Sequence, residues 1–228
     1  WSAVNYVDRA VKNGALLMTG TSAVKVLTAN GRANGVEAVD SKGPLRILAD
    51  IVILSAGGIH TPIILQRSGV DKAGKKMFCD PFITTYGISR DTNQTKGINA
   101  PMYIIKPGRF IAFPFIDPPV QFTLYNGWKP LLGQFPRMKA LGMMVKIADE
   151  PIGKVNANGS IEKPITSKDK DKFKEGNKIV KELLIKAGAN PKSVSTIRPI
   201  RGPHPGGTAA IGEVVNKNLE TEIKNLFV

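Results

Sequence analysis

The stretch ADIVILSAGGIHTPIILQRSGV, residues 49–70, decides which fold the sequence predicts. It begins with an apolar run at 51–54 that does not alternate with polar residues, and such a run is typical of a strand buried on both faces. A turn of small residues, AGG at 56–58, follows the run. A helix is expected over about 61–68, because a proline suits its first turn and a glycine follows its end. Strand, turn and helix in this order predict an α/β layer.

The N-terminal part of the chain extends this layer. Apolar residues at helical spacing predict a helix over 2–13, and an apolar segment at 15–20 predicts a short strand. Residues 22–43 predict two strands joined by an Asn-Gly turn at 30–31. The first 75 residues are therefore expected to form one mixed layer of helices and strands.

A different pattern begins near residue 80. Prolines and glycines separate short β-rich runs, which are FITTYGISR, MYIIK, RFIAFPFI, VQFTLYN and LGMMVKIAD. With a hairpin expected around Asn158-Gly159, these runs favour an antiparallel sheet. One helix is expected at about 167–187, with Thr166 as its N-cap and Gly188 just past its end. The predicted fold class is α/β, with a nucleotide-binding layer from 1–75 and 200–228 and an inserted α+β domain at 76–199.

Composition narrows the classes of function. The 228 residues carry 32 Lys and Arg against 18 Asp and Glu, a net charge of +14, but the lysines are dispersed, which favours a solubilising surface over nucleic-acid binding. The single cysteine, Cys79, can form no internal disulfide and is expected to be a buried, inert thiol. Two histidines and no acidic cluster argue against a zinc site. No apolar run suits a membrane span and no signal peptide is visible, so a cytoplasmic location is expected.

Three stretches resemble the glucose-methanol-choline (GMC) oxidoreductases, a family of flavoenzymes. In the opening stretch the matching residues are Thr61-Pro62, Ile64-Leu65 and Ser68-Gly69-Val70, whereas Gly58 and Asp71 depart from the commonest family residues. The segment IGKVNANGSIEKPITSKDKDKFKEG, 152–176, resembles the family's substrate-domain hairpin and helix. The segment HPGGTAAIGEVVNKNLETEIKNLFV, 204–228, resembles its His-x-x-Gly-Thr stretch. The resemblance implies a Rossmann-like FAD-binding domain at 1–75 and 200–228 and a substrate-binding domain at 76–199.

Two pairs of residues become candidates for contact with FAD. Ala56 and Gly57 follow the buried strand, and ligands of a doubly wound sheet bind beyond the carboxyl ends of its strands. Ala23 and Val24 match the strand whose backbone pairs with the adenine in family members. The alternatives are tight helix–strand packing for the first pair and an ordinary sheet edge for the second.

His204 is the candidate catalytic base. It lies between two prolines and before Gly206 and Gly207, whose backbone can approach a large flat ring such as the flavin. Oxidation of a CH–OH group removes a hydroxyl proton, which an imidazole can accept, and a hydride, which the flavin accepts at its N5 atom. The motif alone also fits a turn with an exposed histidine, and the resemblance favours the catalytic role. His60 is expected to have only a surface or capping role.

The family's Gly-x-Gly-x-x-Gly turn, which holds the FAD pyrophosphate, is not found in the sequence. We therefore expect an internal part of a longer enzyme that acts on a small-molecule alcohol, binds FAD only weakly by itself, and has the missing N-terminal part as a partner. Two other classes stay open. One is a degenerate or split fragment without turnover, and the other is a basic binding module for anionic partners.

Overall fold

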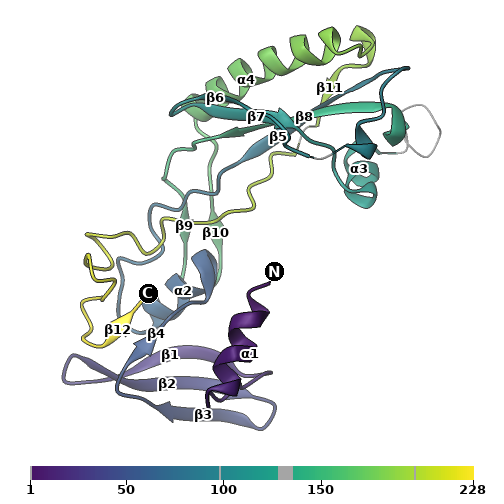
Figure 1. The fold of residues 1–228 in the computed structure, drawn as a ribbon. Helices are drawn as coiled ribbons and strands as arrows, with labels where there is room; N and C mark the ends of the chain where they lie inside the picture. Colours follow the sequence, from purple (N-terminus) through teal and green to yellow (C-terminus); the bar gives the residue numbers. More distant parts are fainter. Residues whose placement is uncertain (1, 98, 128–135, 198) are drawn as a thin grey trace. The chain divides into compact units, whose positions relative to one another are not determined.

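The computed structural model describes residues 2–97, 99–127, 136–197 and 199–228. They form two compact units. Unit 1 comprises the residues up to Gly74 together with Asn156–Ser160 and Ala209–Val228, and unit 2 comprises Lys75–Val155 and Ile161–Thr208. Both helices and strands occur, and the predicted mixed α/β class is confirmed (Figure 1).

Unit 1 begins with helix α1 (Val4–Lys12), as predicted. A three-stranded antiparallel sheet follows, and it comprises β1 (Ser22–Ala29), β2 (Arg32–Asp40) and β3 (Gly43–Leu48). The Asn30-Gly31 turn joins the first two strands, with both residues at positive φ, as the sequence predicts. The strand expected over 15–20 is wrong, because this segment has no strand partner and its apolar side chains are exposed.

The segment at 49–70 forms strand β4 (Val52–Ile53) and helix α2 (Gly57–Arg67). Strand β4 pairs in parallel with β12 (Leu226–Phe227), so segments from opposite ends of the sequence meet in this unit. The expectation of burial on both faces is wrong for the described residues, since Val52 is 6% exposed but Ile53 is 67% exposed. Helix α2 also begins earlier than predicted, within the small-residue stretch at 56–58. Its proline therefore lies in the second turn, where only one backbone donor is lost.

The C-terminal end of α2 explains why Ser68-Gly69 ends the helix. The N–H of Gly69 donates to the carbonyl of Gln66 at 3.1 Å, and the N–H of Val70 donates to that of Leu65 at 3.0 Å. This is a Schellman arrangement, which requires a left-handed residue, and Gly69 has a φ of +94°. The Ser68 hydroxyl donates to the carbonyl of Ile64 at 2.6 Å and accepts the N–H of Val26 in β1 at 2.8 Å. Ser68 therefore ties α2 to the three-stranded sheet.

Unit 2 contains a five-stranded antiparallel sheet in the order β11-β5-β8-β7-β6. The strands are β5 (Phe82–Ile88), β6 (Ile104–Lys106), β7 (Phe110–Pro114), β8 (Ala140–Ile147) and β11 (Ser195–Thr196). The hairpin strands β9 (Lys154–Val155) and β10 (Ile161–Glu162) form where the Asn158-Gly159 turn predicts them. Short 3₁₀ turns occur at Gln94–Lys96, Arg137–Lys139 and Pro191–Ser193.

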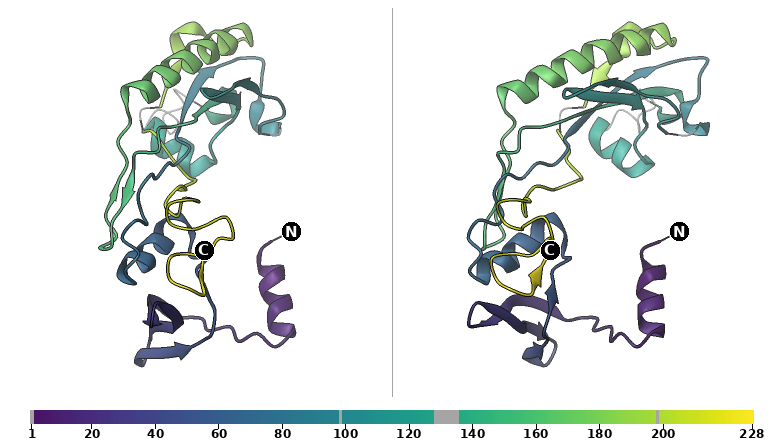
Figure 2. Two further views of the ribbon diagram at one scale, coloured as in Figure 1. Left: turned by 90° about the vertical axis from the view of Figure 1, so that its left-hand side faces the viewer. Right: turned by 60° about the vertical axis from the view of Figure 1, so that its left-hand side comes forward.

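Helix α4 (Ser167–Lys186) covers one face of this sheet (Figures 1 and 2). It begins with a capping box between Thr166 and Asp169, and Gly188 follows its end at a φ of +94°, so the predicted boundaries are confirmed. Its Phe173, Val180 and Leu184 pack in one cluster with alternate residues of the strands, which include Ile83, Phe110, Ala112, Leu141, Met143, Val145 and Ile147. Because strand side chains alternate, the residues between these point to the opposite face.

The run VQFTLYN, expected as a strand, is instead helix α3 (Pro119–Asn126). Pro119 is its first residue, where the fixed φ suits a helix start and the missing N–H costs nothing. Its Phe122 is fully buried and meets the ring of Tyr86 in β5 edge-on, at 4.9 Å between centroids. Helix α3 therefore lies on the face of the sheet away from α4. This second face carries the candidate site.

The expected domain boundary near residue 75 lies beside the observed one at Gly74. Residues 200–208 are expected from the sequence to belong with residues 1–75, but they lie in unit 2. The reason is local, because Arg201 pairs with Phe82, the first residue of β5, and Gly206 pairs with Phe78 shortly before that strand. The assignment of the two units to FAD and substrate binding stays a prediction.

We expect Ser68→Ala to lower the free energy of unfolding of unit 1 by about 1–3 kcal/mol, since it leaves the N–H of Val26 without its acceptor. Urea unfolding followed by circular dichroism measures the change. Ser41→Ala, at an exposed turn position, is the control and should change the value by less than about 0.5 kcal/mol. Equal effects of the two substitutions would contradict the role given to Ser68.

Candidate functional site

The segment that carries His204 is held against the residues that lead into β5. Phe82 and Arg201 exchange two backbone hydrogen bonds, of 2.7 and 3.1 Å, and Phe78 and Gly206 exchange two more, of 3.1 and 3.0 Å. Between these pairs the N–H of His204 donates to the carbonyl of Cys79 at 3.4 Å. The predicted catalytic residue is thus fixed at both ends of its loop.

The imidazole of His204 lies beside a carboxylate and an ammonium group. Its Nδ1 atom is 3.0 Å from Oδ2 of Asp80 and 3.2 Å from Nζ of Lys146, and Lys146 also forms an ion pair with Asp80. The His204 side chain is 62% exposed, whereas that of Lys146 is 17% exposed. We call these three residues the His204 cluster.

The pleat of the sheet explains how Lys146 reaches this cluster. Val145 and Ile147 belong to the core beneath α4, so Lys146 between them points to the opposite face. It pairs in register with Phe82 of β5, and Asp80 lies two residues before that partner. The cluster therefore lies at one end of the face that also carries Thr84 and Tyr86.

The contacts of Nδ1 limit what the imidazole can do. A carboxylate oxygen only accepts hydrogen bonds, so a bond from His204 to Asp80 requires a proton on Nδ1. The contact with Lys146 requires a lone pair on the same atom, so the two bonds exclude each other. With Asp80 as acceptor, Nε2 keeps its lone pair and can accept a proton from a neighbouring molecule. Such carboxylate-oriented imidazoles are suited to general-base chemistry.

A buried polar network lies beside the start of the same segment. The Arg201 guanidinium pairs with Asp117 at 2.6 Å, bonds to Thr84, and stacks over the rings of Phe82 and Tyr125 at 4.3 and 4.5 Å. Burial, together with the neighbouring Asp117 carboxylate, raises the pKa of the Tyr86 hydroxyl, which donates to Asp117 at 2.7 Å. This network fixes the backbone where the His204 segment begins.

The two glycines after His204 are needed for packing inside unit 2. A Cβ on Gly206 would lie 2.6 Å from the ring of Phe78. A Cβ on Gly207 would lie 2.3 Å from the carbonyl oxygen of Lys76, and Gly207 also has a φ of +80°. The close backbone approach predicted for these glycines therefore occurs against the chain itself. Their contact with a flavin stays a prediction.

In unit 1 the predicted FAD contacts lie at two places. Ala56 is the N-cap of α2, and Gly57 is its first residue, with a φ of +76° and open space where a Cβ would be. Ala23 is paired with Ala38 in β1–β2, but Val24 falls at an irregularity in the register. Open backbone at the start of α2, just past a parallel strand, is suited to an anionic or planar ligand. The roles of all four residues stay predictions.

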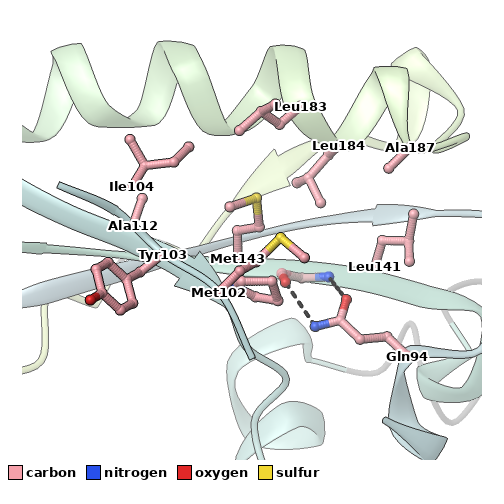
Figure 3. Close-up of a pocket in the computed structure, with 12 residues that line it drawn as sticks. Gln94, Met102, Tyr103, Ile104, Ala112, Leu141, Met143, Leu183, Leu184 and Ala187 are labelled. Atoms are coloured by element: carbon pink, nitrogen blue, oxygen red, sulfur yellow. Dashed lines mark hydrogen bonds between the residues drawn. The ribbon is translucent and has the colours of Figure 1, made fainter. Parts of the chain in front are cut away.

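An apolar pocket of about 310 Å³ lies on the other face of the sheet, beneath α4 (Figure 3). Leu183, Leu184 and Ala187 of α4 line one side, and Leu141 and Met143 of β8 line the other. The side-chain amide of its one strongly polar residue, Gln94, is bonded to the backbone of Gly142. Among the described residues that line this pocket there is no Asp, Glu, His, Lys or Arg.

The sequence pattern gives no sign that Asp80 and Lys146 belong to the site. They lie 124 and 58 positions from His204, and only the strand pairing brings them together.

His60 lies exposed on α2. Among the described residues there is no group of three or more His, Cys, Asp or Glu that could hold a metal. None of the helices described is long and apolar enough to span a membrane.

A protein family and a known protein resemble this chain in sequence. A family model described as GMC oxidoreductase matches residues 2–91. An uncharacterised protein of Methanocaldococcus jannaschii, MJ1450, is 30% identical over 212 residues, which are 92% of this chain and 53% of that protein. The chain thus spans about half the length of this relative.

Solved structures share the fold at low sequence identity. A pyridoxine 4-oxidase from Mesorbium loti is 15% identical, with a TM-score of 0.64 over 93% of this chain and 52% of that one. A formate oxidase is 16% identical, with a TM-score of 0.58 over 91% and 54%. An FAD-dependent oxidoreductase from Chaetomium thermophilum is 15% identical, with a TM-score of 0.59 over 97% and 58%. These likenesses confirm the fold.

We expect Gly207→Ala to destabilise unit 2 clearly more than Gly108→Ala. Both glycines have positive φ, at +80° and +69°, and an L-residue there costs about 1–2 kcal/mol. Only at Gly207 does the added Cβ also meet a carbonyl oxygen, whereas Gly108 has nothing within 4 Å. Urea unfolding of the two variants measures the difference. Equal losses would show that the contact with Lys76 does not matter.

Proposed function

We propose that the chain is part of a GMC oxidoreductase, an FAD-dependent enzyme that oxidises the CH–OH group of a small-molecule alcohol. The family model over 2–91 and the fold shared with oxidases support an oxidoreductase. The observation that carries the proposal is the imidazole of His204, which Asp80 contacts at Nδ1 at 3.0 Å and whose side chain is 62% exposed.

In the proposed reaction the substrate hydroxyl donates its proton to Nε2 of His204. The electron pair of the broken O–H bond forms the second carbon–oxygen bond as a hydride leaves the same carbon, and the product is a carbonyl compound. Bound FAD supplies the acceptor for that hydride. Asp80 accepts the Nδ1–H and stabilises the imidazolium that forms, as a carboxylate does in other oriented imidazoles. Lys146 holds the Asp80 carboxylate in place.

The residues of unit 1 fit a role in holding FAD. At the start of α2 the backbone of Ala56 and Gly57 is open, follows a parallel strand, and offers the positive end of the helix dipole. We assign Ala23 and Val24 to the adenine end, and Gly206 and Gly207 to the side of the ring near His204. These assignments rest on the family resemblance and on the backbone at each position.

We also propose that a further part of the enzyme is the partner of this chain and completes FAD binding. Two observations support it. The chain spans about half of the relatives that it matches. In unit 1, Ile51 is 59% exposed and Ile53 is 67% exposed, although they flank and form a strand of a parallel pair, and such strands are normally covered on both faces.

The remaining alternatives make different predictions. A degenerate protein without turnover would keep the fold but would not reduce FAD with any alcohol. A basic binding module would bind a polyanion such as heparin with strong dependence on salt. We prefer the enzyme because Lys146, the lysine in contact with His204, is paired with the Asp80 carboxylate.

We expect His204→Ala in the full-length enzyme to slow anaerobic bleaching of the flavin by an alcohol about 100- to 10,000-fold, because the hydroxyl proton loses its acceptor. The flavin content should change little, because His204 is assigned to proton transfer. A panel of primary and secondary alcohols, followed at the flavin absorbance maximum, measures the rates.

His60→Ala is the control, since His60 is exposed on α2 in unit 1. It should bleach at close to the wild-type rate. Unimpaired bleaching by His204→Ala, or greater damage from His60→Ala, would remove His204 from the role of base.

A further inference from the structure

Asp80, the carboxylate that orients His204, has an unusual backbone conformation. Its φ is +53°, in the left-handed region that non-glycine residues seldom adopt, although Asp tolerates it better than most. Pro81 follows, and a residue before proline is normally extended. Such a conformation persists only where the surroundings hold it, and these positions gather at functional sites.

The group that holds this turn is the carboxylate of Asp149, just after β8. Its Oδ1 accepts the N–H of Asp80 at 3.0 Å, and its Oδ2 accepts the N–H of Cys79 at 3.1 Å. Two successive backbone donors thus converge on one side chain, which fixes the direction in which the Asp80 side chain leaves the backbone. Asp149 itself makes no contact with His204 in the described structure.

Asp149 is buried, with only 2% of its side chain exposed, and Lys163 neutralises it at 2.9 Å. The Lys163 side chain is 10% exposed, and its ammonium also donates to the carbonyls of Glu150 and Pro164 at 3.1 and 3.3 Å. Burial, reinforced by the charge of Asp149, raises the pKa of the Cys79 thiol, so the cysteine in this turn stays neutral. The turn at 79–80 is therefore held by one buried carboxylate, Asp149, whose charge Lys163 neutralises.

The other side of the same turn touches the His204 segment. Gly202 lies so close that a Cβ there would be 2.4 Å from Sγ of Cys79 and 3.1 Å from its carbonyl oxygen. A shift of the turn would therefore move Asp80 and push on the backbone that carries His204. Asp149, the turn and the imidazole are linked by direct contacts in one unit.

From these contacts we infer that Asp149 and Lys163 are positioning residues for His204. They hold the left-handed turn at Asp80, and this turn places the Asp80 carboxylate against Nδ1 of the imidazole. This inference rests on the proposed function of His204 as the base. Without Asp149 the turn relaxes toward an extended conformation, the Asp80 carboxylate turns away from Nδ1, and Lys146 becomes the remaining neighbour of that atom. Since Lys146 donates, the imidazole then places its proton on Nε2 and loses the lone pair that accepts the substrate proton.

The experiment is ¹⁵N NMR of the imidazole in the full-length holoenzyme labelled at histidine, with the signal assigned by its loss in His204→Ala. Wild type should show the form with the proton on Nδ1. Asp149→Asn/Lys163→Met, which removes both buried charges together, should shift the signal toward the form with the proton on Nε2. Its kcat should fall on the order of 100-fold, the loss that about 1 Å of misplacement can cause, with little change in flavin content.

Two matched variants separate positioning from stability. Lys163→Arg keeps the charge and should retain the wild-type signal. Val180→Ala makes a cavity in the core beneath α4, on the other face of the sheet, and should lower the unfolding temperature without moving the His204 signal.

An unchanged His204 signal and unchanged kcat in the double variant would overturn the inference and leave the pair with a structural role only. A shift of the His204 signal in both Val180→Ala and the double variant would also overturn the inference. Failure of the proposed function looks different, because His204→Ala would then keep its activity. The NMR experiment would still show whether Asp149 determines which ring nitrogen of His204 carries the proton.

Discussion

The antiparallel pairing of residues 201–206 with residues 78–82 is the constraint on which the candidate site depends. Four backbone hydrogen bonds join segments that lie more than a hundred positions apart, at Phe82–Arg201 and Phe78–Gly206. Without this pairing His204 would be a residue in an exposed, proline-rich loop. With it, the imidazole meets Asp80 and Lys146, and the loop acquires chemistry that its own residues do not have.

The two faces of the five-stranded sheet have different roles, because side chains alternate between the faces along each strand. One face is mainly apolar and packs beneath α4, and it holds the pocket shown in Figure 3. The other face carries buried polar residues, Thr84 and Tyr86, and at its end Lys146. Each polar group there has a partner from outside the strands, such as Asp117 or Arg201. The polar face can therefore be rigid without being apolar, which a positioned base requires.

Sequence patterns predicted the elements that depend on local chemistry. Thr166 and Gly188 set the ends of α4, and the Asn30-Gly31 turn set a hairpin, because capping and turn geometry involve neighbouring residues only. The patterns failed where distant contacts decide. A run with β-rich composition became α3, whose Phe122 packs on Tyr86 of β5, and Ile53 is exposed because no described segment buries that side of β4. His204 could be singled out by its setting, but Asp80, Lys146 and Asp149 could not, since nothing near them in sequence indicates a histidine.

The most direct test of the account is a crystal structure of the full-length enzyme with FAD and a bound alcohol analogue. The account predicts that Nε2 of His204 lies within hydrogen-bond reach, about 2.6–3.2 Å, of the analogue's oxygen, with the carbon that bears it facing N5 of the flavin. Nδ1 should still contact Asp80. An imidazole directed away from the flavin, with another residue in contact with that oxygen, would contradict the central claim.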